Sequence, residues 1–407
     1  MNQSPTLSRK LGLTLVTLYG LGTILGAGIY VLIGKVSVVA GLYAPLAFGL
    51  AAIISFFTAL SYARLVSIYP RCAGEAVYLR EAFNKKFLSS LVGWLIILTG
   101  IVSSATIANG FVGYLGVFIH IPDWIAITIL ISLLSLIAIW GIAESMWISA
   151  LMTVIEIAGL VMVIIIAGDV IVEPPLPFES YFIVDSFTSL FGVFAGSFLA
   201  FYAFIGFEDM VNVVEEVKNP DFNLPVSIFL AIFISSVFYI LIAVIAVSSL
   251  SIHDLGSTDA PLALILESHN LLSSKIISII SIFAIVNGAL IQIIMGARVL
   301  YGMAREGLAP QALSSINIKT KTPIITTLLV SILVLIFALW LPLLTLAKLT
   351  SFIVLIIFLL VNLSLWRIKH VNKADYENSI HSINFPIIGA LFCLFLIVFQ
   401  IYDLVTG

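Results

Sequence analysis

The chain has 407 residues, of which 61% are hydrophobic and only 10% are charged, and its mean hydropathy is +1.22. In soluble domains about a quarter of the residues are usually charged. This composition therefore excludes a soluble protein and predicts a protein embedded in the lipid bilayer. The formal net charge of −3 gives little information on other partners, and we expect no nucleic acid among them.

Apolar runs of about 20 residues recur along the chain, and each can cross the roughly 30 Å of bilayer hydrocarbon as a helix. We therefore predict an all-α polytopic membrane protein with about 11 transmembrane helices. Their approximate ranges are 11–35, 42–67, 88–119, 124–142, 148–168, 187–218, 224–250, 274–303, 323–341, 346–366 and 386–405. The residues before the first run do not resemble a cleavable signal peptide, so this run is expected to direct its own insertion.

The positions of Lys and Arg predict the orientation. With the N-terminus in the cytoplasm, 15 of the 18 Lys and Arg residues fall on the cytoplasmic side, and Lys35, Lys275 and Lys348 fall on the other. Such a bias follows the positive-inside rule. We expect a multi-pass protein of the cell (plasma) membrane with a cytoplasmic N-terminus.

The first span contains four glycines within GLGTILGAGIY (20–30), namely Gly20, Gly22, Gly26 and Gly28. Glycine weakens a helix, and a broken helix at membrane depth is tolerated where it is buried in protein or lines a cavity, as in the binding sites of many transporters. Small residues four apart are also typical of helix packing faces. On this segment alone both interpretations stay open.

The sixth span shows a second interruption in FLAFYAFIGFEDMVNVVEEVKNP (198–220), which contains Gly206 and then two acids, Glu208 and Asp209. Two disturbed spans that are five apart indicate inverted repeats, with a binding site between the broken helices. We predict a single transmembrane domain over 1–407, with repeats at 11–168 and 187–366 and an additional helix at 386–405.

Four segments resemble the amino acid–polyamine–organocation superfamily of transporters, in order along nearly the whole chain. They are GLGTILGAGIYVLIG (20–34), YPRCAGEAVYLREAF (69–83), AFIGFEDMVNVVEEVKNPDFNLP (203–225) and GARVLYGMAREGLAPQAL (296–313). The resemblance implies a LeuT-type fold of two inverted five-helix repeats with helices 1 and 6 broken. Members usually have twelve spans, so eleven indicate loss of the last one.

Two broken helices can bind a free amino acid without charged side chains. The amides of Gly26, Ala27 and Gly28 would begin the second half of helix 1 and donate to the substrate carboxylate. Carbonyl groups where the first half of helix 6 ends, and one before the break in helix 1, would accept from the ammonium group; these belong to Tyr202, Ala203, Ile205 and Ile24. The resemblance implies the same contacts and makes Tyr202 an aromatic gate over bound substrate, although a packing role is the alternative.

The pocket for the substrate side chain is predicted less directly. Polar side chains in the third and eighth spans are available to it, but most of them are expected to be hydrogen-bond links between helices; they are Ser103, Ser104, Thr106, Asn109, Asn287 and Gln292. No carboxylate clearly faces this pocket, which favours a neutral or modestly apolar amino acid.

Glu156 lies inside the fifth span among apolar neighbours, where an ionised carboxylate is costly and often functional. Related proton-coupled transporters often carry a lysine at the matching position, so this chain reverses the charge. Glu156 could relay a proton, hydrogen-bond to helix 1 or bind a cation. Sodium is less expected, because the eighth span lacks an adjacent Ser/Thr pair. After the sixth-span break, Glu208 and Asp209 either cap the half-helix or take part in gating and proton transfer.

Other functional classes have weaker support. The chain has no GxxxxGK[ST] motif for ATP, and its five histidines are scattered near loops and span ends, so neither a primary pump nor an enzyme is expected. We predict a secondary active transporter of amino acids, with no cofactor or metal and with a proton as the coupling ion. The alternatives are an exchanger, including one for cationic amino acids or polyamines, and a transporter-like receptor.

Overall fold

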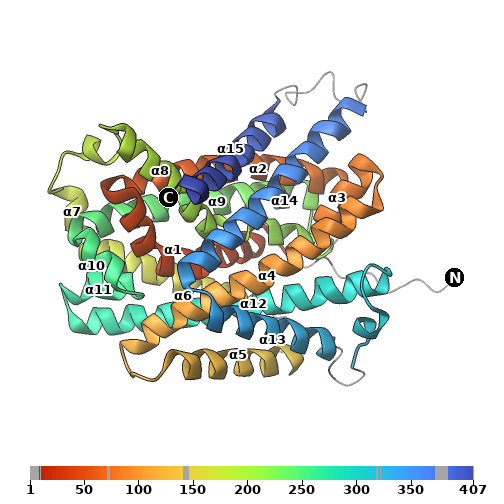
Figure 1. The fold of residues 1–407 in the computed structure, drawn as a ribbon, viewed down its shortest axis with the longest axis horizontal. Coiled ribbons are helices and arrows are strands. Elements are labelled where there is room, and N and C mark those ends of the chain that lie inside the picture. Colours follow the sequence, from red (N-terminus) through yellow and green to blue (C-terminus); the bar gives the residue numbers. More distant parts are fainter. Residues whose placement is uncertain are drawn as a thin grey trace.

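The computed structural model describes residues 9, 11–70, 74–140, 146–317, 320, 322–371 and 384–406, with the backbone only for Ala27 and residues 146–148. Within these residues the regular elements are helices (Figure 1). One isolated parallel β-bridge joins Leu11 to Val217.

The long helices account for the predicted spans. They are α1 (Leu13–Ala40), α2 (Ala44–Ile68), α4 (Lys86–Gly116), α5 (Asp123–Trp140), α6 (Met146–Ala167), α8 (Phe187–Ala200), α9 (Pro220–Ser249), α12 (Leu271–Arg305), α13 (Ile324–Trp340), α14 (Leu343–Val371) and α15 (Phe385–Thr406). Short helices connect or extend them: η1 (Gly41–Tyr43), α3 (Gly74–Phe83), α7 (Asp169–Val172), η3 (Phe178–Tyr181), η4 (Phe201–Phe204), η5 (Phe207–Glu216), α10 (Ile252–Ser257), α11 (Pro261–Glu267) and η6 (Gln311–Ser314).

The described residues contain nine stretches that are long and apolar enough to cross a membrane. One of them, Leu13–Ile68, holds both α1 and α2, which are separated by the turn of η1. The apolar helix α13 is shorter, at 17 residues. The prediction of an all-α polytopic membrane protein is therefore confirmed, and the division into two inverted repeats stays a prediction.

The helices pack around α1. This helix contacts α6, α8, α9 and α12, while α12 runs along α4, and α5 pairs with α13 (Figure 1). The last helix, α15, packs against α14 and α2. Because α1 is covered on several sides, its interior positions are isolated from lipid, which is the condition for breaking a helix at membrane depth.

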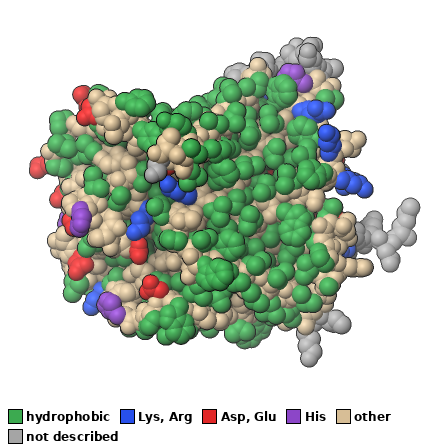
Figure 2. Space-filling model, viewed as in Figure 1, with side chains coloured by type: hydrophobic (Ala, Val, Ile, Leu, Met, Phe, Trp, Pro, Cys, Tyr) green, Lys and Arg blue, Asp and Glu red, His purple; other side chains and the backbone are tan. Residues whose placement is uncertain are grey.

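The charged side chains lie mostly at the two ends of the molecule. On the face shown in Figure 2, acidic side chains occupy the half that holds α7, α10 and α11, together with some Lys and Arg, whereas the charged side chains at the opposite end are Lys and Arg, and apolar side chains cover the surface between them. The end with α7, α10 and α11 includes Asp169, Asp254 and Asp259. This separation agrees with a bilayer around the apolar zone.

Candidate functional site

The first and sixth spans are both interrupted. In α1, Gly26 has non-helical dihedral angles (φ −25°, ψ −127°) and divides the helix into two halves. In the sixth span, α8 continues into η4, the chain becomes extended at Ile205 (φ −66°, ψ 135°), and Gly206 (φ 127°, ψ −21°) leads into η5. Only glycine adopts the Gly206 conformation without strain.

Glycines let the two breaks touch each other. A Cβ atom on Gly28 would lie 2.5 Å from Cα of Ala203, and one on Gly206 would lie 2.4 Å from the carbonyl oxygen of Thr23. Both neighbouring atoms belong to the backbone and have little room to move. The glycines of the two motifs therefore bring broken helix 1 against broken helix 6, rather than serving only as a helix packing face.

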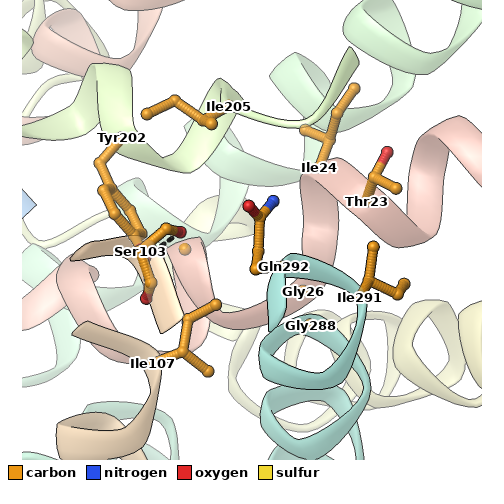
Figure 3. A pocket seen from close by; sticks show the side chains of 11 residues that line it. Thr23, Ile24, Gly26, Ser103, Ile107, Tyr202, Ile205, Gly288, Ile291 and Gln292 are labelled. Carbon is orange, nitrogen blue, oxygen red and sulfur yellow. Dashed lines mark hydrogen bonds between the residues drawn. The ribbon is translucent and has the colours of Figure 1, made fainter. Parts of the chain in front are cut away.

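A pocket lies between these breaks and the helices α4 and α12 (Figure 3). It contains about 420 Å³ of space between the atoms, including the open solvent at its mouth. The lining residues are Thr23, Ile24, Gly26, Gly28, Ser103, Ile107, Tyr202, Ile205, Gly288, Ile291 and Gln292. The pocket is walled mainly by isoleucine side chains and contains no charged residue among these.

The phenol ring of Tyr202 is held at one wall of the pocket. Its hydroxyl group lies 3.1 Å from Oγ of Ser103 on α4 and also donates to the Ser103 carbonyl oxygen at 3.3 Å. Figure 3 shows the ring extending from the sixth span toward α4. Tyr202 therefore bridges a broken helix and a continuous one across the site.

Backbone carbonyl groups at the two breaks are gathered by one tyrosine. The Tyr239 hydroxyl group, on α9, donates between the carbonyl oxygens of Ile24 and Ala203, which lie 2.7 and 2.8 Å away. The Tyr202 carbonyl accepts from the amide of Ile205 at 3.2 Å. These contacts hold the carbonyl groups of Ile24, Tyr202 and Ala203 in place at the two breaks.

The residues predicted to bind substrate lie together. Five of the seven line the pocket, and they are Ile24, Gly26, Gly28, Tyr202 and Ile205. Ala203 packs against Gly28 next to it, and Ala27 is described only as part of the α1 backbone. Their individual contacts with a carboxylate and an ammonium group stay a prediction.

The polar residues of the third and eighth spans divide into two groups. Ser103 and Gln292 line the pocket. The side chain of Asn109 donates to the carbonyl oxygens of Ala105 and Ala338, at 3.0 and 3.1 Å, and so links α4 to α13. Ser104 and Thr106 bond to backbone carbonyl groups, of Ala289 and Val102 respectively. Asn109 and Ser104 are therefore links between helices, as one of the two interpretations expected, whereas the bond from Thr106 stays within α4.

Glu156, on α6, is 1% exposed, and neither carboxyl oxygen has a hydrogen-bond partner. Its backbone carbonyl accepts from the hydroxyl group of Tyr30 at 2.7 Å, which ties α6 to the second half of α1. The side chain of Asn287, next to pocket residue Gly288, interacts with the carboxyl group, although its Nδ2 atom makes no hydrogen bond within 3.5 Å. A buried, ionised carboxyl group that accepts no close hydrogen bond is costly, so Glu156 has capacity to bind a proton.

The two acids after the sixth-span break have different surroundings. Glu208 caps the break, because its Oε2 accepts from the backbone amide of Gly206 at 2.8 Å. Asp209 is 1% exposed and its Oδ2 lies 3.5 Å from Nε2 of Gln292. Both carboxyl groups interact electrostatically with Glu75 of α3. Within the described ranges, no three His, Cys, Asp or Glu side chains are placed to hold a metal ion.

Several site residues were not predicted from the sequence. Tyr239 was missed, although a buried tyrosine inside the seventh apolar span is a signal for a specific hydrogen bond. The apolar wall residues Ile107 and Ile291, and Gly288, were missed because isoleucine and glycine are common in every span. Only the three-dimensional arrangement distinguishes them.

Comparison with known proteins agrees with this geometry. The sequence model of a family described as "Amino acid permease" matches residues 11–407. The chain is 28% identical to the branched-chain amino acid permease BcaP of Bacillus subtilis, over 96% of this chain and 88% of that protein. It is 27% identical to the methylthioribose transporter of the same organism, over 97% of this chain and 88% of that protein.

A vacuolar cationic amino acid transporter 4 of Arabidopsis thaliana is 27% identical over 85% of this chain, which spans 60% of that relative's length. These relatives carry names of transporters, not of enzymes. Because the family match covers nearly the whole sequence, the chain belongs to the amino acid permease family.

Proposed function

We propose that the protein is a secondary active transporter that moves neutral amino acids across the cell membrane by alternating access, coupled to proton symport. The observation that carries the proposal is the pocket between two broken helices, which is lined by residues of both breaks. Such broken helices at membrane depth are the usual binding sites of secondary transporters.

The main chain would recognise the part common to all amino acids. The second half of α1 begins next to Gly26 and directs its first amides, those of Gly26, Ala27 and Gly28, at the substrate carboxylate. The carbonyl groups at the end of η4, together with that of Ile24, accept from the ammonium group. Two of these carbonyls are already oriented by Tyr239, which supports a fixed acceptor geometry.

The side-chain part of the pocket favours an uncharged, apolar substrate. Four isoleucines, Ile24, Ile107, Ile205 and Ile291, contribute to its lining. A cationic side chain there would lose its hydration without gaining a counter-charge. The name of the BcaP relative, a branched-chain amino acid permease, agrees with an aliphatic substrate for this chain.

Glu156 is the proposed proton carrier, with Glu208 as a second group that responds to protonation. Glu156 is 1% exposed and its carboxyl oxygens accept no hydrogen bond within 3.5 Å, and the carbonyl group of Glu156 accepts from Tyr30 just beyond the α1 break. Loading a proton on Glu156 removes the cost of a buried charge and so favours the arrangement in which the two helices stay together. Proton binding and substrate binding would thus stabilise the same state, which is the requirement for symport.

The orientation proposed is a cytoplasmic N-terminus in the plasma membrane. Under it, the basic end of the molecule seen in Figure 2 faces the cytoplasm and the acidic end with α7, α10 and α11 faces outward, in agreement with the positive-inside rule.

The test is uptake of labelled amino acid by proteoliposomes under an imposed inward proton gradient. The substrate is found first by screening the twenty common amino acids for thermal stabilisation of the purified protein, because a ligand of the folded state raises the melting temperature. We expect accumulation that is driven by the gradient and abolished by a proton ionophore. Transport that ignores the gradient but requires amino acid inside the vesicle would establish an exchanger instead.

Replacing Glu156 by Gln should separate coupling from binding. The amide has the shape of the protonated acid but cannot release a proton, so substrate binding should persist while the pH dependence of uptake is lost. The matched control is Glu179→Gln, which changes an exposed acid in the connection after α7 and should transport like the wild type. An unchanged pH profile in Glu156→Gln would remove Glu156 from the coupling mechanism.

A further inference from the structure

Gln292 places a primary amide in the middle of the pocket. It lies on α12, one residue after Ile291, and Figure 3 shows its amide directed toward the space between Tyr202 and Ile24. Its Nε2 atom donates to Oδ2 of Asp209 at 3.5 Å. The amide therefore has one side toward the pocket and the other toward a carboxylate.

The other polar side chains that line the pocket are engaged with protein groups. The hydroxyl group of Thr23 donates to the Gly20 carbonyl at 2.9 Å, and the hydroxyl groups of Ser103 and Tyr202 bond to each other. The rest of the side-chain lining is apolar. Within the lining, Gln292 is thus the side chain best placed to decide which polar groups a substrate side chain can carry.

Asp209 places a carboxyl group just outside the pocket. It is 1% exposed, it is absent from the lining residues, and it interacts electrostatically with the carboxyl groups of Glu208 and Glu75. Three carboxyl groups in one region favour any cation that can reach them. The Gln292 amide stands between this region and the pocket.

Resting on the function proposed above, we infer that Gln292 determines selectivity against cationic amino acids, by covering the Asp209 carboxylate. With the amide in place, a side-chain ammonium group meets only isoleucine and an amide, and its desolvation is not compensated. Without the amide, the same ammonium group can reach the Asp209 carboxyl group, and a cation next to this group favours its ionised form. The chain thus holds a concealed site for basic side chains and keeps it closed with one residue.

The experiment compares L-lysine with L-norleucine, which has the same unbranched four-carbon side chain but lacks the terminal ammonium group. Affinities of purified wild type and Gln292→Ala are measured by calorimetry. In Gln292→Ala we expect lysine to gain about tenfold or more relative to norleucine, since close charge pairs in partly buried sites are worth at least that factor. In Gln292→Ala/Asp209→Asn the gain should disappear.

Two control variants separate charge from space. Ile291→Ala enlarges the pocket on the same helix and should change lysine and norleucine together, whereas Gln292→Met keeps the volume of residue 292 and should leave lysine excluded. Gln292→Ser provides a second truncation in case Gln292→Ala does not fold, and norleucine binding reports folding in every variant.

The outcomes distinguish this inference from the proposed function. If truncation at 292 gives lysine no advantage, or if the advantage survives Asp209→Asn, the shielding role of Gln292 is wrong while neutral amino acid transport stands. If the wild type binds none of the twenty amino acids, the proposed function itself fails.

Discussion

Tyr239 shows how one side chain can organise a site that has almost no charged groups. Its hydroxyl group lies within 2.8 Å of two carbonyl oxygens, one from each broken helix, and its ring packs edge-on against Phe204, with 5.0 Å between the ring centroids. A carbonyl group exposed by a helix break needs a partner in a dry environment. Tyr239 satisfies two of them at once and thereby fixes the distance between the breaks.

Glu75 gives a prediction about pH and stability. It lies on α3, outside the membrane spans, is 4% exposed, and accepts from the Tyr62 hydroxyl group at 3.2 Å. Burial raises the pKa of Glu75 to about 7. The folded protein therefore prefers the protonated acid, so this contribution to stability is complete below the unfolded pKa of 4.5 and is lost as the pH rises from there through about 7.

Glu75→Gln should remove the loss of stability that Glu75 causes as the pH rises. We expect the melting temperature of the wild type in detergent to fall relative to that of the variant between pH 5 and pH 8. The corresponding difference in the free energy of unfolding reaches a few kcal/mol at pH 8. Glu81→Gln, an exposed acid on the same helix, is the control and should follow the wild type. Parallel melting curves for wild type and Glu75→Gln over this range would contradict the assignment.

At the scale of elements, the contact between the two breaks depends on glycines that no other residue can replace. Gly28→Ala would place a methyl group 2.5 Å from the Ala203 backbone, and such overpacking costs about 1–3 kcal/mol. We expect a lower melting temperature and loss of amino acid binding, because the helices that carry the binding groups must separate.

The control for this variant is Gly302→Ala. A Cβ atom on Gly302 meets no atom within 4 Å, and alanine is the better helix former by about 1 kcal/mol, so stability should stay the same or rise. Equal melting temperatures for Gly28→Ala and the wild type would show that the breaks are not in close contact.

Much of the element scale was predictable from the sequence. An apolar run of 20 residues in a bilayer has to form a helix, because its backbone groups have no other partner, so the positions of α2, α4 and α9 followed from hydropathy alone. The break in the sixth span was indicated by Gly206 and Glu208. What could not be predicted is pairing at long range: the bonds from Tyr239 to Ile24 and from Tyr202 to Ser103 depend on packing between distant segments, which leaves no local pattern.

At the scale of the whole molecule, the acidic end is closed over the first helix. Lys35, near the end of α1, lies 2.9 Å from Asp259, between α10 and α11, and its Nζ donates to the Gly256 carbonyl at 3.3 Å. Leu255 of α10 and Leu266 of α11 are fully buried beneath. The ion pair thus helps to hold the α10–α11 segment over the bundle.

Reversing one charge should loosen this closure by a limited amount. Asp259 is 54% exposed, and exposed ion pairs contribute about 1 kcal/mol or less. Lys35→Glu removes this pair and adds a repulsion of similar size, so it should shift the balance of open and closed forms by about thirtyfold at most. The measurement uses a cysteine introduced at Ile107, in a background in which Cys72 and Cys393 are changed to Ser. The rate at which this cysteine is labelled by an impermeant thiol reagent, added from the side of α10 and α11, reports the open form. Lys35→Glu/Asp259→Lys should return labelling to the starting rate, and labelling that ignores both changes would exclude the ion pair from this role.

The short backbone pairing at the basic end has a mechanical consequence. The amide of Leu11 donates to the Glu216 carbonyl at 3.0 Å, and the amide of Lys218 donates to the Leu11 carbonyl at 2.8 Å. These bonds join the beginning of α1 to the end of η5, away from the breaks at Gly26 and Gly206. A movement of the first half of α1 would therefore move η5 with it, and a movement of η5 would move the first half of α1. A force applied at Leu11 would therefore be transmitted through both segments to the residues that line the pocket.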